Sequence, residues 1–278
     1  MTVRLDPPRR SFWPERVAYA SGMLLDDADF RAEQAYHRGR SAMLCRYLFG
    51  HGTVAGLNVA LDAGPPVRVV VAAGLAIDRV GRLIESPLPL CLDLQAWWDD
   101  RTADAASGLA QAFRVGSEGG PDHVLADVFV GFRECEVAKR PAMAADPYDA
   151  LGAVVPLRLR DAVEATLVLR TEDTPPLPER GLPPLAEATP AERLAALDAR
   201  KRAAGWVEDD WWGGIDGTLR PDDEHVPRQN PADLFLARLT LPAVAGTPPT
   251  RHPTLIPTAD NAVRRMSYST AELFALGL

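Results

Sequence analysis

The stretch LFGHGTVAGL, residues 48 to 57, is where the hydrophobic period of the chain changes. Before it, apolar residues recur at helical spacing, which predicts a helix from about Asp27 to Phe49 with Asp26 or Asp27 as its N-cap. After it, the period falls to two, as in a strand. Gly50 and Gly52 stand at the change, as glycine does where a helix ends in a left-handed turn. The chain is therefore expected to pass from a helix directly into antiparallel strands.

The same stretch also fits the G-x-G-x-x-G/A spelling of a dinucleotide-binding loop. In that motif a strand enters the glycine turn and a helix leaves it, so that the helix N-terminus faces the pyrophosphate. Here the helix comes first and its carbonyl end would repel phosphate, so no nucleotide site is expected. His51 has no nucleophile or orienting group at a telling spacing. We expect it to be a turn residue, exposed or paired with a neighbouring carboxylate, and Gly56 to mark a bulge or a close packing.

The helix carries a set of residues that fall near one face, and this face is predicted to pack on a sheet. The set consists of Phe30, His37, Ser41, Leu44, Cys45 and Leu48.

The rest of the chain predicts an α+β fold, with a β-rich antiparallel meander or sandwich, the N-terminal helix packed on it and a few peripheral helices. Strands are expected over residues 53–61 and 67–74, followed by a hairpin over 75–85 and long strands over 123–137 and 153–170. Three regions follow from composition: a core domain over 1–172, a proline-rich connection with a helix and a Trp/acidic loop over 173–232, and C-terminal strands over 233–278 that return to the core.

Composition excludes several classes of partner. The chain has 278 residues, of which 47% are hydrophobic, and a net charge of −8. Binding to nucleic acid or anionic lipid needs clustered positive charge, so neither is expected. No apolar run approaches the roughly 20 residues that span a bilayer. We expect a cytoplasmic protein without membrane insertion, in which Cys45, Cys91 and Cys135 are buried free thiols.

The strongest candidate for a ligand site is GWVEDDWWGGIDGTLRPDDEH, residues 205 to 225, which combines three tryptophans with seven acidic residues. Large aromatic side chains in such a loop suit an anchor into the core or a partner subunit, and they also suit stacking on a sugar ring. Carboxylates are ligands that calcium prefers, but their spacing does not match an EF-hand loop. The tryptophans are Trp206, Trp211 and Trp212, and the candidate carboxylates are Asp209, Asp210, Asp216, Asp222, Asp223 and Glu224.

Three phrases in the first 90 residues each have a distinctive pattern of residue types and spacing. The first, from Gly22 to Arg40, reads G-x-L-L-x-x-x-D-F-x-x-E-Q-x-Y-x-x-x-R; the third, from Val69 to Ile84, reads V-x-V-x-x-G-x-A-I-D-x-x-G-R-x-I. The second lies between them and contains Gly52, Val54, Gly56, Leu57 and Val59. Together they resemble a family of proteins encoded with phage tail-like contractile injection systems, with looser similarity in later strands.

The resemblance implies a non-enzymatic structural or assembly component at or near the baseplate, which packs against copies of itself or other subunits and brings no catalytic residues or cofactor. The polar residues of these phrases are expected to fix the helix over residues 27–49 against the hairpin over residues 75–85, with Asp78 in contact with Arg40 or Arg82. The alternatives are a glycan-binding module, with or without calcium, that uses the Trp/acidic loop, and a hydrolase. No catalytic motif such as G-x-S-x-G or H-E-x-x-H occurs in the chain.

Overall fold

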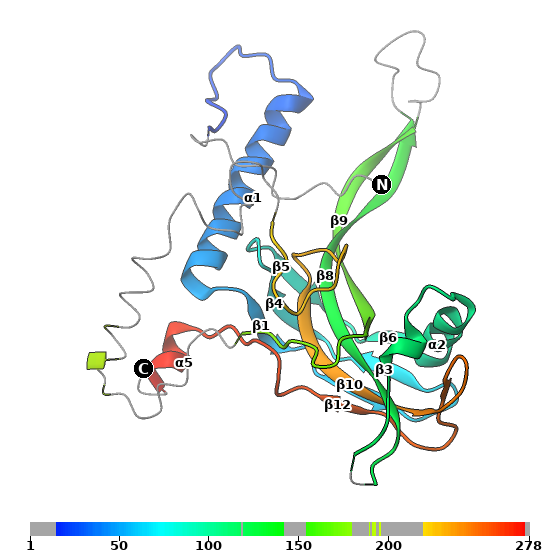
Figure 1. Ribbon diagram of the computed structural model, residues 1–278. Helices are drawn as coiled ribbons and strands as arrows, with labels where there is room; N and C mark the ends of the chain where they lie inside the picture. The colour runs from blue at the N-terminus through cyan, green and yellow to red at the C-terminus, as the bar shows by residue number, and fades with distance from the viewer. Residues whose placement is uncertain are drawn as a thin grey trace.

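The computed structural model describes residues 15–117, 119–141, 154–179, 189, 191–192, 195 and 219–275. Within these ranges the chain forms a β-rich body from which one helix and one long hairpin project (Figure 1). All the strands that pair in ladders do so antiparallel. The predicted α+β class is confirmed.

Helix α1 (Asp27–Phe49) has the predicted bounds, and both of its ends follow from local sequence. The Asp26 carboxylate accepts hydrogen bonds from the amides of Ala28 and Asp29, and the Asp29 carboxylate accepts one from the Asp26 amide, which completes a capping box. Gly50 ends the helix at φ 76°, and its amide donates to the Arg46 carbonyl at 3.0 Å. Gly52, which was expected to share in this stop, is instead the first residue of the next strand.

The first six strands form two small sheets, ordered β1-β4-β5 and β2-β3-β6. One strand was predicted over residues 53–61, and this is wrong. Leu57 has φ 53°, so the chain leaves the first sheet there and enters the second. Gly56 was predicted to mark a bulge or a close packing, and the close packing is present, since a Cβ atom built on it would collide with the Ala73 carbonyl. The register shift of this strand lies earlier, between Thr53 and Ala55. The strands are β1 (Gly52–Gly56), β2 (Val59–Asp62), β3 (Arg68–Val71), β4 (Gly74–Ile77), β5 (Leu83–Ser86) and β6 (Leu90–Asp93).

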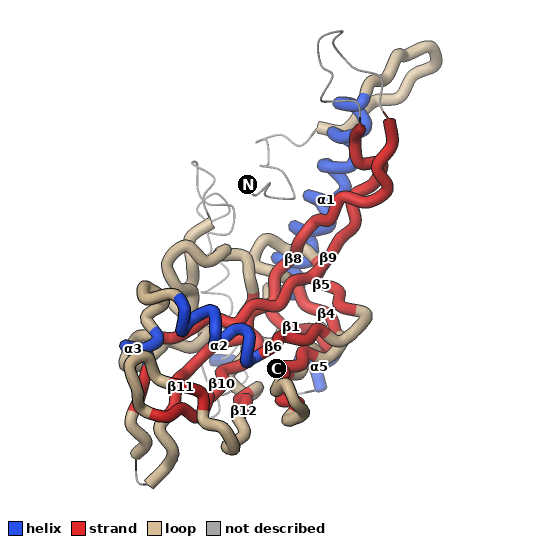
Figure 2. Tube along the Cα trace, turned by 90° about the vertical axis from the view of Figure 1, so that its right-hand side faces the viewer, coloured by secondary structure: helices blue, strands red, loops and turns tan. Residues whose placement is uncertain are grey.

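The remaining strands form a six-stranded sheet in which C-terminal strand β10 pairs with β8. Strand β10 therefore lies in the same sheet as β8. Two short helices, α2 and α3, cover one end of the body, and α2 buries Trp98 in the core (Figure 2). These elements are α2 (Leu94–Ala103), α3 (Leu109–Ala112), β7 (Phe113–Arg114), β8 (His123–Pro141), β9 (Val154–Arg170), β10 (Leu234–Val244), β11 (Thr250–Arg251), β12 (Thr258–Asp260) and α5 (Thr270–Ala275).

About half of the β8–β9 hairpin extends beyond the part of β8 that pairs with β10. The pairing of β10 with β8 ends at Val130, whereas β9 stays paired with β8 as far as Pro141. Residues 131–141 and 154–164 thus form a two-stranded ribbon, which spans roughly 35 Å at about 3.3 Å per residue. Figure 2 shows the ribbon and α1 projecting from the same end of the body.

The six-stranded sheet also holds a buried ionic group. The Arg238 guanidinium donates two hydrogen bonds to the Asp127 carboxylate, at 2.8 and 2.9 Å, across the β8–β10 ladder. A nitrogen of Arg170, which is fully buried, lies 3.4 Å from the same carboxylate. One negative charge therefore serves two arginines inside the body.

Among the described residues, no helix is both long and apolar enough to span a bilayer.

Candidate functional site

The projecting part of the molecule is the best candidate for a functional surface. We call α1 together with the ribbon of residues 131–141 and 154–164 the arm. Arg38 of α1 and Glu134 of β8 form an ion pair at 2.8 Å, so the two parts of the arm are in contact.

The closest approach of the α1 backbone to the body occurs at Gly81. Gly81, in the turn between β4 and β5, has φ 88°, and a Cβ atom built on it would collide with the carbonyl of Ala42 in α1. Of the α1 residues, only Ala42 is buried, at 4% exposure. Small residues on both sides thus let the helix backbone approach the turn.

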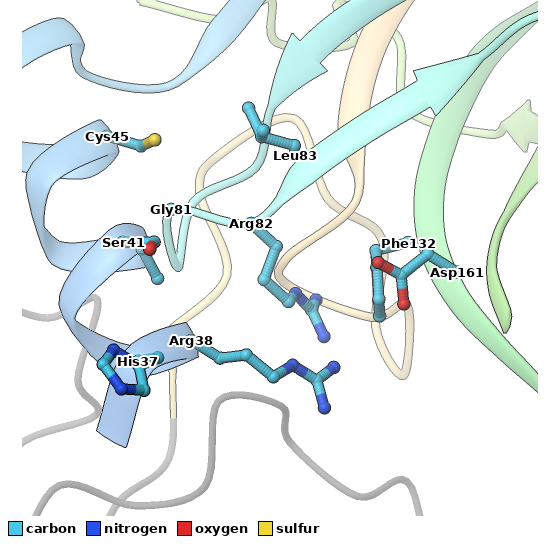
Figure 3. Close-up of a pocket in the computed structure, with 10 residues that line it drawn as sticks. His37, Arg38, Ser41, Cys45, Gly81, Arg82, Leu83, Phe132 and Asp161 are labelled. Carbon is cyan, nitrogen blue, oxygen red and sulfur yellow. The ribbon is translucent and has the colours of Figure 1, made fainter. Parts of the chain in front are cut away.

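A pocket of about 240 Å³ lies beside this contact (Figure 3). The figure shows side chains of α1 on one side, the β4–β5 turn in the middle, and Phe132 and Asp161 of the hairpin on the other. The lining residues are His37, Arg38, Ser41, Ala42, Cys45, Gly81, Arg82, Leu83, Phe132 and Asp161.

The Arg82 side chain in this pocket makes contacts that stabilise the fold. The Arg82 guanidinium donates to the Asp78 carboxylate at 2.6 Å and lies over the Phe132 ring, 4.7 Å from its centroid. Asp78 is fully buried, and burial raises the pKa of its carboxyl, although Arg82 and two backbone amides act in the opposite direction. Of the two predicted contacts of Asp78, the one with Arg82 is present. Arg40 is exposed, with its guanidinium 5.5 Å from the centroid of the Tyr36 ring.

The nucleophilic side chains of the pocket are not activated. Burial raises the pKa of the Cys45 thiol, which keeps it protonated, and a catalytic cysteine needs the opposite shift. His37 bonds to Glu33 at 3.1 Å. In the described part of the chain no hydrogen bond joins His37 to Ser41. The pocket thus lies where α1, the β4–β5 turn and the hairpin meet.

The apolar face predicted for α1 is largely exposed, and the prediction that it packs on a sheet is wrong. Phe30, Leu44 and Leu48 are 53%, 57% and 68% exposed. The helix instead meets the body through Ala42, Cys45 and Tyr47. Leu157 and Leu159 on the ribbon are also exposed. The arm thus presents apolar side chains that the described part of the chain leaves uncovered.

His51 is buried between two charged groups. A nitrogen of the Arg46 guanidinium lies against its Nδ1, and the Asp222 carboxylate is 4.0 Å from its Nε2. Burial and nearby arginines hold the His51 pKa well below its usual value, so the ring is neutral. Of the two environments expected for His51, exposed or beside a carboxylate, the structure shows the second.

The other predicted site residues have different outcomes. Trp206, Trp211, Trp212, Asp209, Asp210 and Asp216 lie outside the described residues. Cys45, Cys91 and Cys135 are free, as predicted, but Cys91 and Cys135 are exposed and Cys45 is half-buried. Sequence reasoning missed Arg38, which joins the two parts of the arm, and the close contact of Ala42 with Gly81. The only available signal was the small size of Ala42 and Gly81, and nothing in the sequence paired them.

No protein-family model matches the sequence, and a search of curated proteins finds no significant match.

Proposed function

We propose that this protein is a non-enzymatic structural or assembly component of a phage tail-like contractile injection particle, at the baseplate or in a peripheral part of the tail, where its arm packs against other subunits. The similarity of residues 22–84 to the family with that role supports this proposal. The geometry of the arm supports it independently.

One observation carries the proposal: α1 has 23 residues and buries only Ala42. A helix of this length spans roughly 34 Å at about 1.5 Å per residue. Isolated helices are marginal in water, and most helical stability in proteins comes from packing of an apolar face. A capped helix with an exposed apolar face is therefore typical of an element that is completed by a partner.

The ribbon leads to the same conclusion. A two-stranded hairpin on its own is at best marginally stable in water. The ribbon nevertheless continues for ten residue pairs beyond the edge of β10, from Gly131–Glu164 to Pro141–Val154. Packing of both arm elements in an assembly would provide the contacts that the body does not.

The proposal is tested by purifying contractile particles from cells that express the tagged protein and measuring its amount by mass spectrometry. We expect a fixed ratio to the sheath and tube subunits. Leu44→Asp with Leu48→Asp should remove the protein from the particles. The matched control is Val115→Asp, because Val115 is 78% exposed and lies on the body. Absence of the unaltered protein from intact particles would overturn the proposal.

The glycan-binding alternative rests on tryptophans outside the described residues, and the hydrolase alternative rests on His51, which has Arg46 and Asp222 as its close neighbours. No observation on the described residues favours either.

A further inference from the structure

A buried polar cluster lies at the base of α1, away from the exposed face of the arm. The guanidinium of Arg79 donates hydrogen bonds to the carbonyls of Arg220 and Pro231, at 2.7 and 2.6 Å, and to Oδ1 of Asp222 at 2.7 Å. Arg79 follows strand β4, whereas its partners belong to the segment that precedes β10. One buried arginine therefore fixes the path of residues 219–233 against the body.

Three metal-ligating side chains meet in this fixed segment. One carboxylate oxygen from Asp222, one from Glu224 and one ring nitrogen of His225 lie within 4.8 Å of one another. Glu224 and His225 are 7% and 8% exposed, whereas Asp222 is partly open to solvent. The Glu224 carboxylate accepts a hydrogen bond from its own backbone amide.

His225 has the hydrogen-bond pattern of a metal ligand. Its Nε2 lies 3.0 Å from the carbonyl oxygen of Asp233, and since a carbonyl only accepts, Nε2 carries the proton. Its Nδ1 then presents a lone pair, and this buried atom has no hydrogen-bond partner. Metal-binding histidines characteristically donate their other ring N–H to a backbone carbonyl in this way. An unpaired buried acceptor is otherwise costly, and a bound cation would satisfy it.

Asp222 is held so that one oxygen remains available. Arg79 occupies Oδ1, and Oδ2 lies 4.0 Å from Nε2 of His51. Ligands of a tetrahedral zinc ion, at about 2.0 to 2.1 Å from the metal, are separated by roughly 3.4 Å. The three ligand atoms, which lie within 4.8 Å of one another, must therefore move slightly closer together around an ion.

We propose that Asp222, Glu224 and His225 form a binding site for one divalent transition-metal ion, of which Zn²⁺ is the best match. Imidazole nitrogen favours zinc and its neighbours in the first transition series over calcium, while carboxylates accommodate several divalent ions. Two carboxylates and one neutral imidazole leave a coordination position open for water. The site is independent of the proposed assembly function, and it differs from the calcium alternative considered for the acidic loop because a histidine is a ligand.

The test uses the full chain, stripped with chelator and titrated calorimetrically with Zn²⁺ alone and with Ca²⁺ alone at neutral pH. We expect one Zn²⁺ per chain, and binding at least about tenfold weaker in His225→Gln. The matched control is His37→Gln, because His37 also lies beside a glutamate, Glu33, but is exposed on α1. This control should bind Zn²⁺ as the unaltered chain does.

Circular dichroism establishes that each variant is folded, and Glu224→Gln serves as the second variant if His225→Gln does not fold. Loss of Zn²⁺ binding in either folded variant supports the site. The proposal is overturned if the chain shows no saturable Zn²⁺ binding, if both folded variants bind as the unaltered chain does, or if Ca²⁺ binds and Zn²⁺ does not.

Discussion

At the scale of single residues, Gly81 determines whether α1 can reach the body. Its φ of 88° disfavours any side chain, and a Cβ atom there would also strike the Ala42 carbonyl. We expect Gly81→Ala to lower the free energy of unfolding by about 2 to 5 kcal/mol, from left-handed strain and overpacking together. Denaturant unfolding measures this change.

Gly22 provides the matched control for that substitution. It has nearly the same φ, 84°, but a Cβ atom there would meet nothing within 4 Å. Gly22→Ala should therefore show only the backbone strain, about 1 to 2 kcal/mol. If the two variants lost equal stability, the close approach of Ala42 to Gly81 would have no energetic role.

The buried carboxylate of Asp127 gives a second prediction. Asp127→Asn removes the buried carboxylate that Arg170 and Arg238 share, while Glu172 remains 3.2 Å from Arg170, and we expect breaking this buried group to cost about 3 to 5 kcal/mol. The control is Glu164→Gln, which also removes a carboxylate paired with an arginine, but one that is 54% exposed. That change should cost about 0 to 1 kcal/mol. Similar losses in the two variants would contradict the importance of burial.

The thiol of Cys45 allows a test by pH. Because burial raises its pKa above the usual value of 9.0, Cys45 has little thiolate at pH 8. Alkylation, followed by peptide mass spectrometry, should be slow at Cys45 and accelerate only as the pH rises beyond that value, since the thiolate is the nucleophile. The exposed Cys91 and Cys135 should react first. Reaction of Cys45 at their rate at pH 8 would contradict the geometry of the pocket.

At the scale of elements, the helix and the sheet should differ sharply in stability. Helix α1 buries one residue, whereas β10 is buried along most of its length. Amide hydrogen exchange of the isolated chain should therefore be fast in α1 and slowest in β10 and the part of β8 that pairs with it. Protection of α1 equal to that of β10 would show that the helix is stable without a partner, and would remove the main support for an interface on the arm.

The elements also show which features were predictable from sequence. The bounds of α1 could be predicted because a capping aspartate and a terminal glycine act within one turn of the chain. The direction of its apolar face could not, because periodicity shows that Leu44 and Leu48 share a face and does not show what covers it. For the same reason, alternation over residues 123–137 predicted a strand but could not show that β10 stops pairing at Val130.

At the scale of the whole molecule, the candidate site is non-local, which is why little of it was predicted. The arm depends on the meeting of Ala42 with Gly81 and of Arg38 with Glu134, residues 39 and 96 positions apart. His51 and Asp222 were each singled out in the sequence, but their proximity results from Arg79 binding the segment before β10. At this scale the class of fold followed directly from sequence, because it depends on local periods.

Because β10 pairs with β8, we predict that the body unfolds as one unit, even though composition divides the chain into three regions. Strand β10 lies between β8 and β12, and it supplies fully buried Leu236, Leu239 and Leu241 to the core that β8 also lines. A chain ending at residue 172 would expose that face of β8, so we expect it to lack a cooperative thermal transition and to bind hydrophobic dyes. The full chain should show a single transition with matching calorimetric and van't Hoff enthalpies. A cooperative melt of the shortened chain would instead establish residues 1–172 as an independent domain, and β10 would then be an addition to a core that folds without it.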